Sequence, residues 1–279
     1  MGRRADGYHL IQSLFWPLDF GDELRLEPSS KLEVEAVWAP DAPVPTKGLP
    51  QGRENLVFRA AEKALRGESA WSVEIQKRVP MGAGLGGGSS NAGSLLAELR
   101  RQGQIDEATA EQIALGLGAD VPFFLGDTPS WVEGIGEKRQ AVRVSKPVRE
   151  NLSFLLVLPP RATPTPVLFA KYRSLGLPFA RRVKWDGGAK ALDWKTLKTY
   201  LTRAENSLQS VAALEYPLIQ EVLAELEKTQ PLHAAMSGTG STCFAVYTKA
   251  ETARRAAKDL LLFCRKSNCQ SILARTHWG

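Results

Sequence analysis

Hydrophobic and polar residues alternate at the period of a β-strand in much of the first half of the chain. Every second residue from Val73 to Val79 falls on one face, Lys77 included, which predicts a strand. Residues 23–28 and 31–38 also alternate and predict an antiparallel pair of strands. The other strands predicted here cover residues 10–16, 130–132 and 138–144. Helical spacing predicts helices at residues 54–65, 92–102 and 106–117.

The second half of the chain begins with an unbroken apolar run, residues 152–158, which is typical of a buried strand. Thr248 and Glu251 have capping-box spacing and predict the start of a helix that runs to about residue 265. The other predicted elements are helices at 167–175, 194–202, 206–214 and 217–228, and strands at 233–236, 242–247 and 269–275. This order predicts an α+β sandwich. We therefore expect two domains, residues 1–150 and residues 151–279.

A glycine-rich stretch joins a predicted strand to a predicted helix. It spans residues 80–91 and has five glycines in seven positions. Glycines let backbone N–H groups converge, and a helix start adds N–H groups without partners, so the stretch predicts a phosphate-binding loop. Ser89 and Ser90 are expected to cap the helix or to donate to phosphate. A linker or an ordinary helix start is the alternative, but two apolar elements flank the stretch. It is neither a Walker A loop nor a dinucleotide-binding fingerprint.

The composition narrows the class of protein. The chain has 279 residues, 43% hydrophobic and 24% charged, as in an ordinary globular protein. We expect a cytoplasmic protein with reduced cysteines, because the sequence shows no signal peptide, no membrane-spanning run and no metal spacing among its three cysteines. The net charge of +6 suits an anionic substrate and also nucleic acid. The densest basic positions lack interleaved aromatic residues, which argues against nucleic acid.

Several other residues are candidates for the chemistry. Asp120 follows a helix end and is the best candidate for a general base beside the phosphate site, although alone it would be taken for a turn residue. The loop that starts at Gly238 is a second backbone phosphate contact or a tight turn. Tyr8 and His9 bind a base or sugar, or only pack.

In combination, these motifs are far more specific than any one of them. The chain resembles the GHMP small-molecule kinases. Within them it resembles the branch that phosphorylates the 2-hydroxyl group of a cytidine-diphosphate sugar alcohol in isoprenoid precursor synthesis. The motifs that carry the resemblance lie in order at residues 2–9, 54–56, 80–91, 118–123, 205–208 and 236–240. The Gly-Tyr-His element at the start separates this branch from the others.

The resemblance implies an α+β fold of two domains, a ribosomal-S5-domain-2-like first domain and a ferredoxin-like second domain. It implies that Asp120 takes the proton of the acceptor hydroxyl group. It implies ATP and Mg²⁺ as cofactors and a small-molecule substrate, with no nucleic acid or membrane partner, in a monomer or homodimer. The residues implied to hold ATP are Pro80, Met81, Gly82, Ala83, Gly84, Leu85, Gly86, Gly87, Gly88, Ser89 and Ser90, with Asn55, Leu56 and Gly238 nearby. The residues implied to form the cytidine pocket are Tyr8, His9, Phe15, Thr165, Pro166 and Phe169.

One feature of the family has no counterpart in this sequence. The family begins with a strand that carries Pro-Ala-Lys-x-Asn, whereas here Met1 stands almost directly before the first motif. No later lysine lies in that context, since Lys31 and Lys77 lie on strands of another pattern. We therefore expect weak or no activity and a natural start farther upstream. The alternatives are a relative that only binds its ligands and a GHMP kinase for another alcohol.

Overall fold

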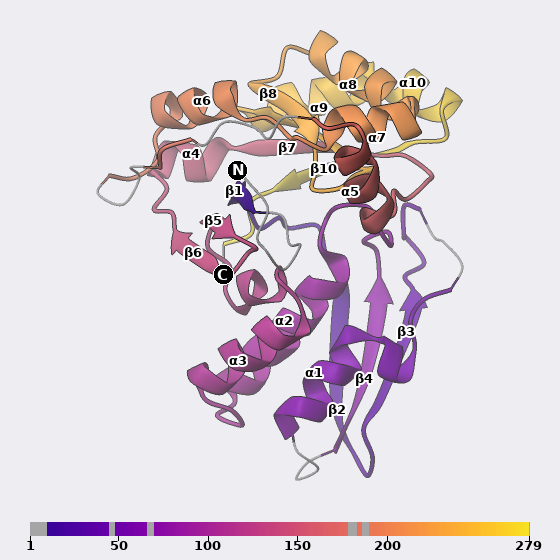
Figure 1. The fold of residues 1–279 in the computed structure, drawn as a ribbon, viewed down its shortest axis with the longest axis vertical. Helices are drawn as coiled ribbons and strands as arrows, with labels where there is room; N and C mark the ends of the chain where they lie inside the picture. The colour runs from indigo at the N-terminus through magenta and orange to yellow at the C-terminus, as the bar shows by residue number, and fades with distance from the viewer. Residues whose placement is uncertain (1–9, 45–47, 66–69, 178–182, 186–189, 279) are drawn as a thin grey trace.

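The computed structural model describes residues 10–44, 48–65, 70–177, 183–185 and 190–278 (Figure 1). In Figure 1 much of the first half of the chain, in purple and magenta, lies at the bottom of the view. The second half, from pink to yellow, lies at the top. A small sheet lies between the two halves.

The first sheet holds β2 (Glu23–Ser29), β4 (Ala70–Lys77) and β3 (Glu33–Trp38) in that order. β4 pairs antiparallel with β2 and parallel with β3. The predicted antiparallel pair of β2 and β3 is therefore wrong, because β4 lies between them. A parallel pair needs a crossover connection. The chain provides it through η1 (Gly52–Glu54) and α1 (Leu56–Leu65).

Three helices pack with this sheet around one core: α1, α2 (Gly87–Arg101) and α3 (Glu107–Leu117). Val73 and Ile75 of β4 are buried in that core together with Leu96 of α2. The face predicted from alternation is confirmed, since Lys77 and Val79 are buried as well.

The second sheet has the order β10 (Gln270–Arg275), β7 (Ser153–Leu158), β9 (Cys243–Tyr247) and β8 (His233–Met236), with every pair antiparallel. All six residues of β7 are buried, as the apolar run predicts. This burial arises because side chains of β7 enter two different cores: Leu155 and Val157 enter one, and Leu156 and Leu158 enter the other.

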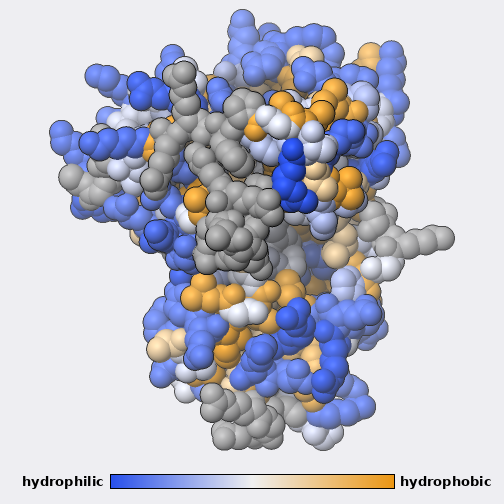
Figure 2. Space-filling view, viewed as in Figure 1, coloured by the Kyte–Doolittle hydropathy of each residue, from blue (hydrophilic) through white to orange (hydrophobic). Residues whose placement is uncertain are grey.

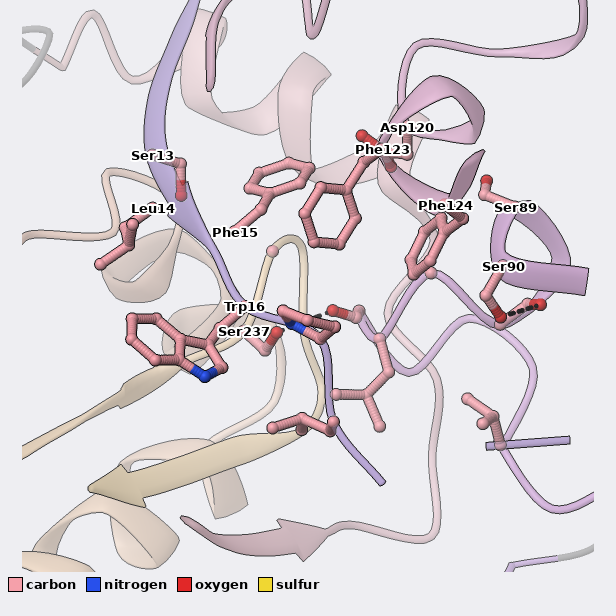
Figure 3. A pocket seen from close by; sticks show the side chains of 18 of the residues that line it. Ser13, Leu14, Phe15, Trp16, Ser89, Ser90, Asp120, Phe123, Phe124 and Ser237 are labelled. Atoms are coloured by element: carbon pink, nitrogen blue, oxygen red, sulfur yellow. Dashed lines mark hydrogen bonds between the residues drawn. The ribbon is translucent and has the colours of Figure 1, made fainter. Parts of the chain in front are cut away.

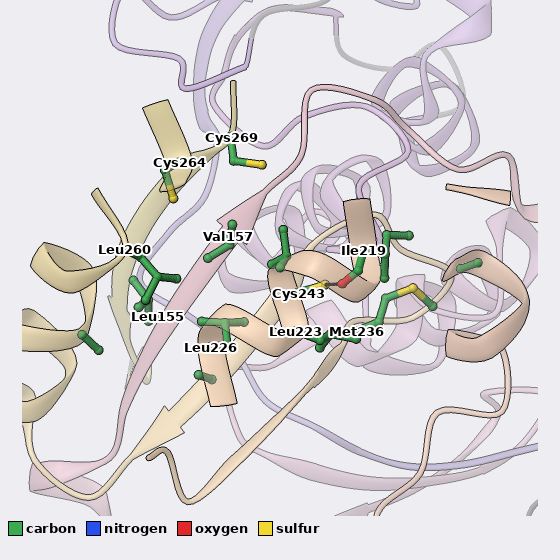
Figure 4. Packing of buried hydrophobic residues seen from close by; sticks show 14 of the residues in the cluster. Leu155, Val157, Ile219, Leu223, Leu226, Met236, Cys243, Leu260, Cys264 and Cys269 are labelled. Atoms are coloured by element: carbon green, nitrogen blue, oxygen red, sulfur yellow. Dashed lines mark hydrogen bonds between the residues drawn. The ribbon is translucent and has the colours of Figure 1, made fainter. Parts of the chain in front are cut away.

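The core formed by Leu155 and Val157 (Figure 4) lies against helices of the second half. They are α5 (Thr165–Ser174), α7 (Gln209–Glu215), α8 (Leu218–Lys228), α9 (Ala250–Asp259) and α10 (Leu261–Lys266). The predicted capping box is wrong, because the N-cap of α9 is Lys249 and makes no side-chain hydrogen bond. Thr248 therefore lies one position too early. The single helix predicted there is two helices, which meet at Leu260.

The small sheet consists of β1 (Ile11–Phe15), β5 (Ser130–Gly134) and β6 (Lys138–Ala141), all antiparallel. Its Trp131 shares a core with Leu156 of β7, Val148 of α4 (Lys146–Asn151) and Leu197 of α6 (Trp194–Arg203). That core draws residues from both sides of position 150, and the domain boundary there stays a prediction.

On the face drawn in Figure 2, many of the hydrophobic residues gather toward the middle of the molecule, while hydrophilic residues cover much of both ends. Within the described part of the chain, no helix combines the length and the apolar character that crossing a membrane requires.

Candidate active site

A large cleft brings together most of the residues proposed from the sequence. Its volume is about 3130 Å³, and its wall includes the glycine loop, Asp120, Phe15 and Gly238. Pockets for one small ligand are typically about 300–1,000 Å³. The cleft therefore has room for two substrates side by side. Figure 3 shows part of it from close by, with Asp120 and Ser89 from one wall and Phe15 and Trp16 from another.

In the glycine loop, every second residue from 82 to 86 has a backbone conformation that favours glycine. Gly82, Gly84 and Gly86 have φ angles of 64°, 75° and 68°, in the left-handed region that side chains disfavour. Gly86 is the N-cap of α2, so the helix begins at Gly87, five residues earlier than the predicted start at residue 92. The first N–H groups of a helix have no partner within it, and they carry the positive end of the helix dipole. The loop therefore presents an anion-binding helix start to the cleft.

The two serines of the loop do not cap the helix. Ser89 and Ser90 lie inside the first turn, because Gly86 already occupies the N-cap position. Ser90 Oγ donates to the carbonyl oxygen of Gly87 at 2.8 Å. Ser89 lines the cleft, and the described residues offer its hydroxyl no hydrogen-bond partner. Of the two roles expected for Ser89, donation to a ligand is the one that this geometry leaves open.

A second loop, residues 237–242, lies directly against the glycine loop. Ser237 Oγ donates to the carbonyl oxygen of Gly84 at 2.8 Å, and Thr242 N donates to that of Ala83 at 3.2 Å. Asn206 Nδ2 donates to the carbonyl oxygen of Gly238 at 2.7 Å and holds the second loop in place. The second half of the chain thus supports the glycine loop of the first half. The sequence placed Ser237 in the motif at residues 236–240 but gave it no role of its own, because that role depends on a contact across 153 residues.

Asp120 lies between α3 and the short helix η2 (Val121–Leu125). η2 packs closely on α2, since a Cβ atom on Gly93 would lie 2.5 Å from Cβ of Phe124. Arg139 of β6 donates to the carbonyl oxygen of Pro122 and forms two hydrogen bonds with Glu111, at 2.6 and 2.7 Å. These contacts fix the turn that carries Asp120.

The carboxyl group of Asp120 has an unusual environment. Asp120 as a residue is exposed and opens onto the cleft, while neighbouring protein atoms replace part of the water around its carboxyl group. This loss of solvation raises the pKa of Asp120 above its ordinary value of 3.8. A carboxylate with a raised pKa is a better proton acceptor, which suits a general base.

Aromatic side chains form another part of the cleft wall. Phe15 and Phe123 meet edge to face, with their ring centroids 5.2 Å apart. Thr165, Pro166 and Phe169 of α5 line the same cleft. Thr165 Oγ1 lies 2.9 Å from Thr239 Oγ1 and so links this wall to the second loop. Tyr8 and His9, the other residues assigned to this pocket, lie outside the described residues.

Asn55 and Leu56, the two residues assigned near the nucleotide, have different environments in the structure. Leu56 lines the cleft. The side chain of Asn55 instead caps α1: its Oδ1 accepts from Val57 N at 2.9 Å, and its Nδ2 donates to the carbonyl oxygen of Pro50 at 3.0 Å. Asn55 is not among the residues that line the cleft, and its place near the nucleotide stays a prediction.

Lys31 and Lys77, two lysines that do not match the lysine motif of the family, have very different environments. Lys31 is exposed and pairs with Glu33 at 2.6 Å. Lys77 lines the cleft beside the glycine loop, where its ammonium group is buried and pairs with the carboxylate of Asp22. The sequence did contain a signal for Lys77, because a lysine on the buried face of a strand needs a partner.

Comparisons with known proteins agree with this geometry. The family described as GHMP kinases N terminal domain matches residues 55–127, and that described as GHMP kinases C terminal matches residues 188–265. The chain is 35% identical to the 4-diphosphocytidyl-2-C-methyl-D-erythritol kinase of Chelativorans sp. (strain BNC1), over 92% of this chain and 85% of that protein. It is 34% identical to the enzyme of the same name from Mesorhizobium japonicum, over 93% and 85%.

A solved structure gives the same result. The crystal structure of a 4-(cytidine 5'-diphospho)-2C-methyl-D-erythritol kinase superposes with a TM-score of 0.72 at 27% identity, and the match covers 99% of this chain and 94% of that one. The expected α+β fold of two GHMP kinase domains is confirmed. The chain belongs to the 4-diphosphocytidyl-2-C-methyl-D-erythritol kinase family of the GHMP kinases.

Proposed function

We propose that this protein transfers the terminal phosphoryl group of ATP to the 2-hydroxyl group of 4-diphosphocytidyl-2-C-methyl-D-erythritol. The observation that carries the proposal is that one cleft joins the glycine loop to the carboxyl group of Asp120, whose pKa is raised by partial loss of solvation. Phosphoryl transfer needs a phosphate cradle, a base for the acceptor hydroxyl and in-line placement of the two, with little covalent chemistry by the protein.

The glycine loop is the proposed site for the ATP phosphates. Its left-handed glycines and the start of α2 present backbone N–H groups where the wall lacks bulky side chains. A Cβ atom on Gly88 would come no closer than 3.6 Å to Leu56 Cδ1, so this part of the loop is open. Ser89 can add a hydroxyl donor. These groups favour the negative charge of a polyphosphate.

Asp120 is the proposed general base. As the acceptor hydroxyl attacks the phosphorus atom, the carboxylate takes its proton, and the raised pKa makes that transfer more favourable. Arg139 keeps the turn of Asp120 in place without entering the reaction.

The aromatic wall is the proposed site for the cytosine ring of the acceptor. Phe15 and Phe169 offer flat apolar surfaces in the same cleft as Asp120. Base stacking on an aromatic side chain is typically worth about 1–3 kcal/mol. Such a wall would hold the cytidine end, and the hydroxyl group would extend toward Asp120.

Mg²⁺ would arrive with the nucleotide. No three His, Cys, Asp or Glu side chains of the described residues gather into a metal site. Mg²⁺ often takes only one or two protein oxygens and keeps phosphate oxygens and waters as its other ligands. Ser89 and Asp120 are oxygen groups of this kind in the cleft. When bound, the ion neutralises charge on the transferred group.

The test is substrate-dependent release of ADP. The protein is incubated with ATP, Mg²⁺ and a panel of alcohols that includes the cytidylyl substrate, homoserine, mevalonate and galactose, and ADP is measured by a coupled assay. Turnover with the cytidylyl substrate alone, lost in Asp120→Asn, supports the proposal. Preference for another alcohol would replace the substrate, and saturable ATP binding without turnover would indicate a protein that only binds its ligands.

A further inference from the structure

A buried carboxylate lies beneath the glycine loop. The side chain of Asp22 is 0% exposed, and Asp22 belongs to none of the motifs discussed above. It accepts hydrogen bonds from Arg78 N at 2.7 Å, from Val79 N at 2.8 Å and from Asn91 Nδ2 at 2.9 Å. The ammonium group of Lys77 is its fourth donor. Four donors thus converge on this one carboxylate.

The four donors lie at the two ends of the loop. Lys77, Arg78 and Val79 lead from β4 into it, and Asn91 lies in α2, which follows it. Asp22 therefore joins the strand before the loop to the helix after it. A single side chain sets the separation of the two elements between which phosphate would bind.

The ammonium group of Lys77 can donate further hydrogen bonds. It carries three N–H donors, and among the described residues Asp22 is its one hydrogen-bond partner. Its Nζ would lie 3.2 Å from a Cβ atom on Gly87, the first residue of α2. Lys77 is 5% exposed and lines the cleft. A cation with free donors thus lies beside a helix start that already favours anions.

Stability alone explains this arrangement poorly. Burying an ion pair costs desolvation energy, and well-packed neutral residues often stabilise a fold as much or more. The pair is nevertheless placed at the loop rather than in the core of the domain. We infer that Asp22 is a positioning residue that holds the Lys77 ammonium group at the first turn of α2, where it binds a phosphate group of the nucleotide. The inference rests on the proposed function.

The test separates folding from binding with three variants: Asp22→Asn, Lys77→Met and the double variant. Binding of ATP with Mg²⁺ is measured by calorimetry without the acceptor, and stability by thermal melting. Each single variant leaves a buried polar group unmatched and should lower the melting temperature by more than about 5 °C. The double variant has no buried charge, so its melting temperature should return close to that of the native chain.

Binding should not return with it. The double variant lacks the cation, and losing a hydrogen bond to a charged group should weaken ATP binding about tenfold or more. Kinetics should show the same division: the KM for ATP rises, while the KM for the acceptor alcohol stays within about twofold, because the aromatic wall is unchanged. A purely structural pair predicts instead that affinity returns together with stability.

Two further variants guard against an uninformative result. Asn91→Ala keeps both charges and removes one donor to Asp22, and it should raise the dissociation constant for ATP about threefold. Lys31→Met is the matched control, because it makes the same substitution at a lysine of the same half, whose ion pair with Glu33 is exposed and does not line the cleft. It should leave ATP affinity unchanged. A double variant that binds ATP within twofold of the native chain would overturn the inference. A native chain that binds no ATP would overturn the proposed function as well.

Discussion

Gly84 and Gly88 lie four residues apart in the same loop, and a methyl group should have opposite effects at the two positions. At Gly84, a Cβ atom would lie 2.2 Å from the carbonyl oxygen of Ser237 and 2.9 Å from Gly240 N. Both are backbone atoms, which cannot rotate out of the way. At Gly88 the nearest atom would be Leu56 Cδ1 at 3.6 Å, an ordinary contact.

The magnitude follows from three contributions at Gly84. Its φ of 75° costs alanine about 1–2 kcal/mol. The clash forces the two loops apart and removes the hydrogen bond from Ser237 Oγ to Gly84, worth about 1 kcal/mol. Residual overpacking adds about 1–3 kcal/mol. Gly84→Ala should therefore destabilise the fold by about 3–6 kcal/mol. Gly88→Ala lies in a helix and should stabilise it by about 0.5 kcal/mol.

Urea unfolding followed by circular dichroism checks both values, with the two variants measured beside the native chain. The pair is matched because both changes add one methyl group to one loop. A Gly84→Ala variant within 1 kcal/mol of the native chain would show that the two loops are not pressed together, and it would refute the reasoning.

Four further predictions concern the cleft. Asp120→Asn should cut turnover by about two to four orders of magnitude and leave ATP binding intact. Because the pKa of Asp120 is raised in the folded state, its ionised form opposes folding, so stability falls as pH rises from 3.8 through the raised pKa. The same variant should therefore melt higher than the native chain at pH 7 but not below pH 3.8, as pH-dependent melting would show. Phe15→Ala and Phe169→Ala should raise the KM for the cytidylyl substrate more than the KM for ATP, and equal effects would contradict a base-binding wall. Arg139→Leu removes the donor to Pro122 and should lower kcat without changing the KM for ATP, in steady-state assays with both substrates varied.

Local patterns of hydrophobic and polar residues predicted much of the fold. The buried face of β4 follows from its alternation and the buried strand β7 follows from its apolar run, because each pattern lies within one short segment. The pairing of β2 and β3 was predicted wrongly. Both strands alternate and only a few residues separate them, which is the pattern of a hairpin. The competing strand β4 comes 32 residues after the end of β3 and leaves no mark on the local pattern.

The site shows the same division. The glycine loop stands out because five glycines in seven positions are unusual, and Asp120 stands out only in combination with that loop. The start of α2 was misplaced because glycine has low helix propensity, so the pattern shows a helix only from residue 92. Asp22 carried no signal, since its four donors come from residues more than 50 positions away. Only the folded chain brings them together.

The contact between the glycine loop and residues 237–242 has a consequence for the order of folding. Ser237 reaches Gly84 across 153 residues, so this hydrogen bond closes one of the longest loops in the chain. Such contacts form late, because the chain loses much entropy before they contribute any stability. A ribosome releases the glycine loop well before it releases the segment that supports it. The nascent first half therefore emerges from the ribosome with its glycine loop unsupported, and the loop gains this support only after Thr242 has emerged.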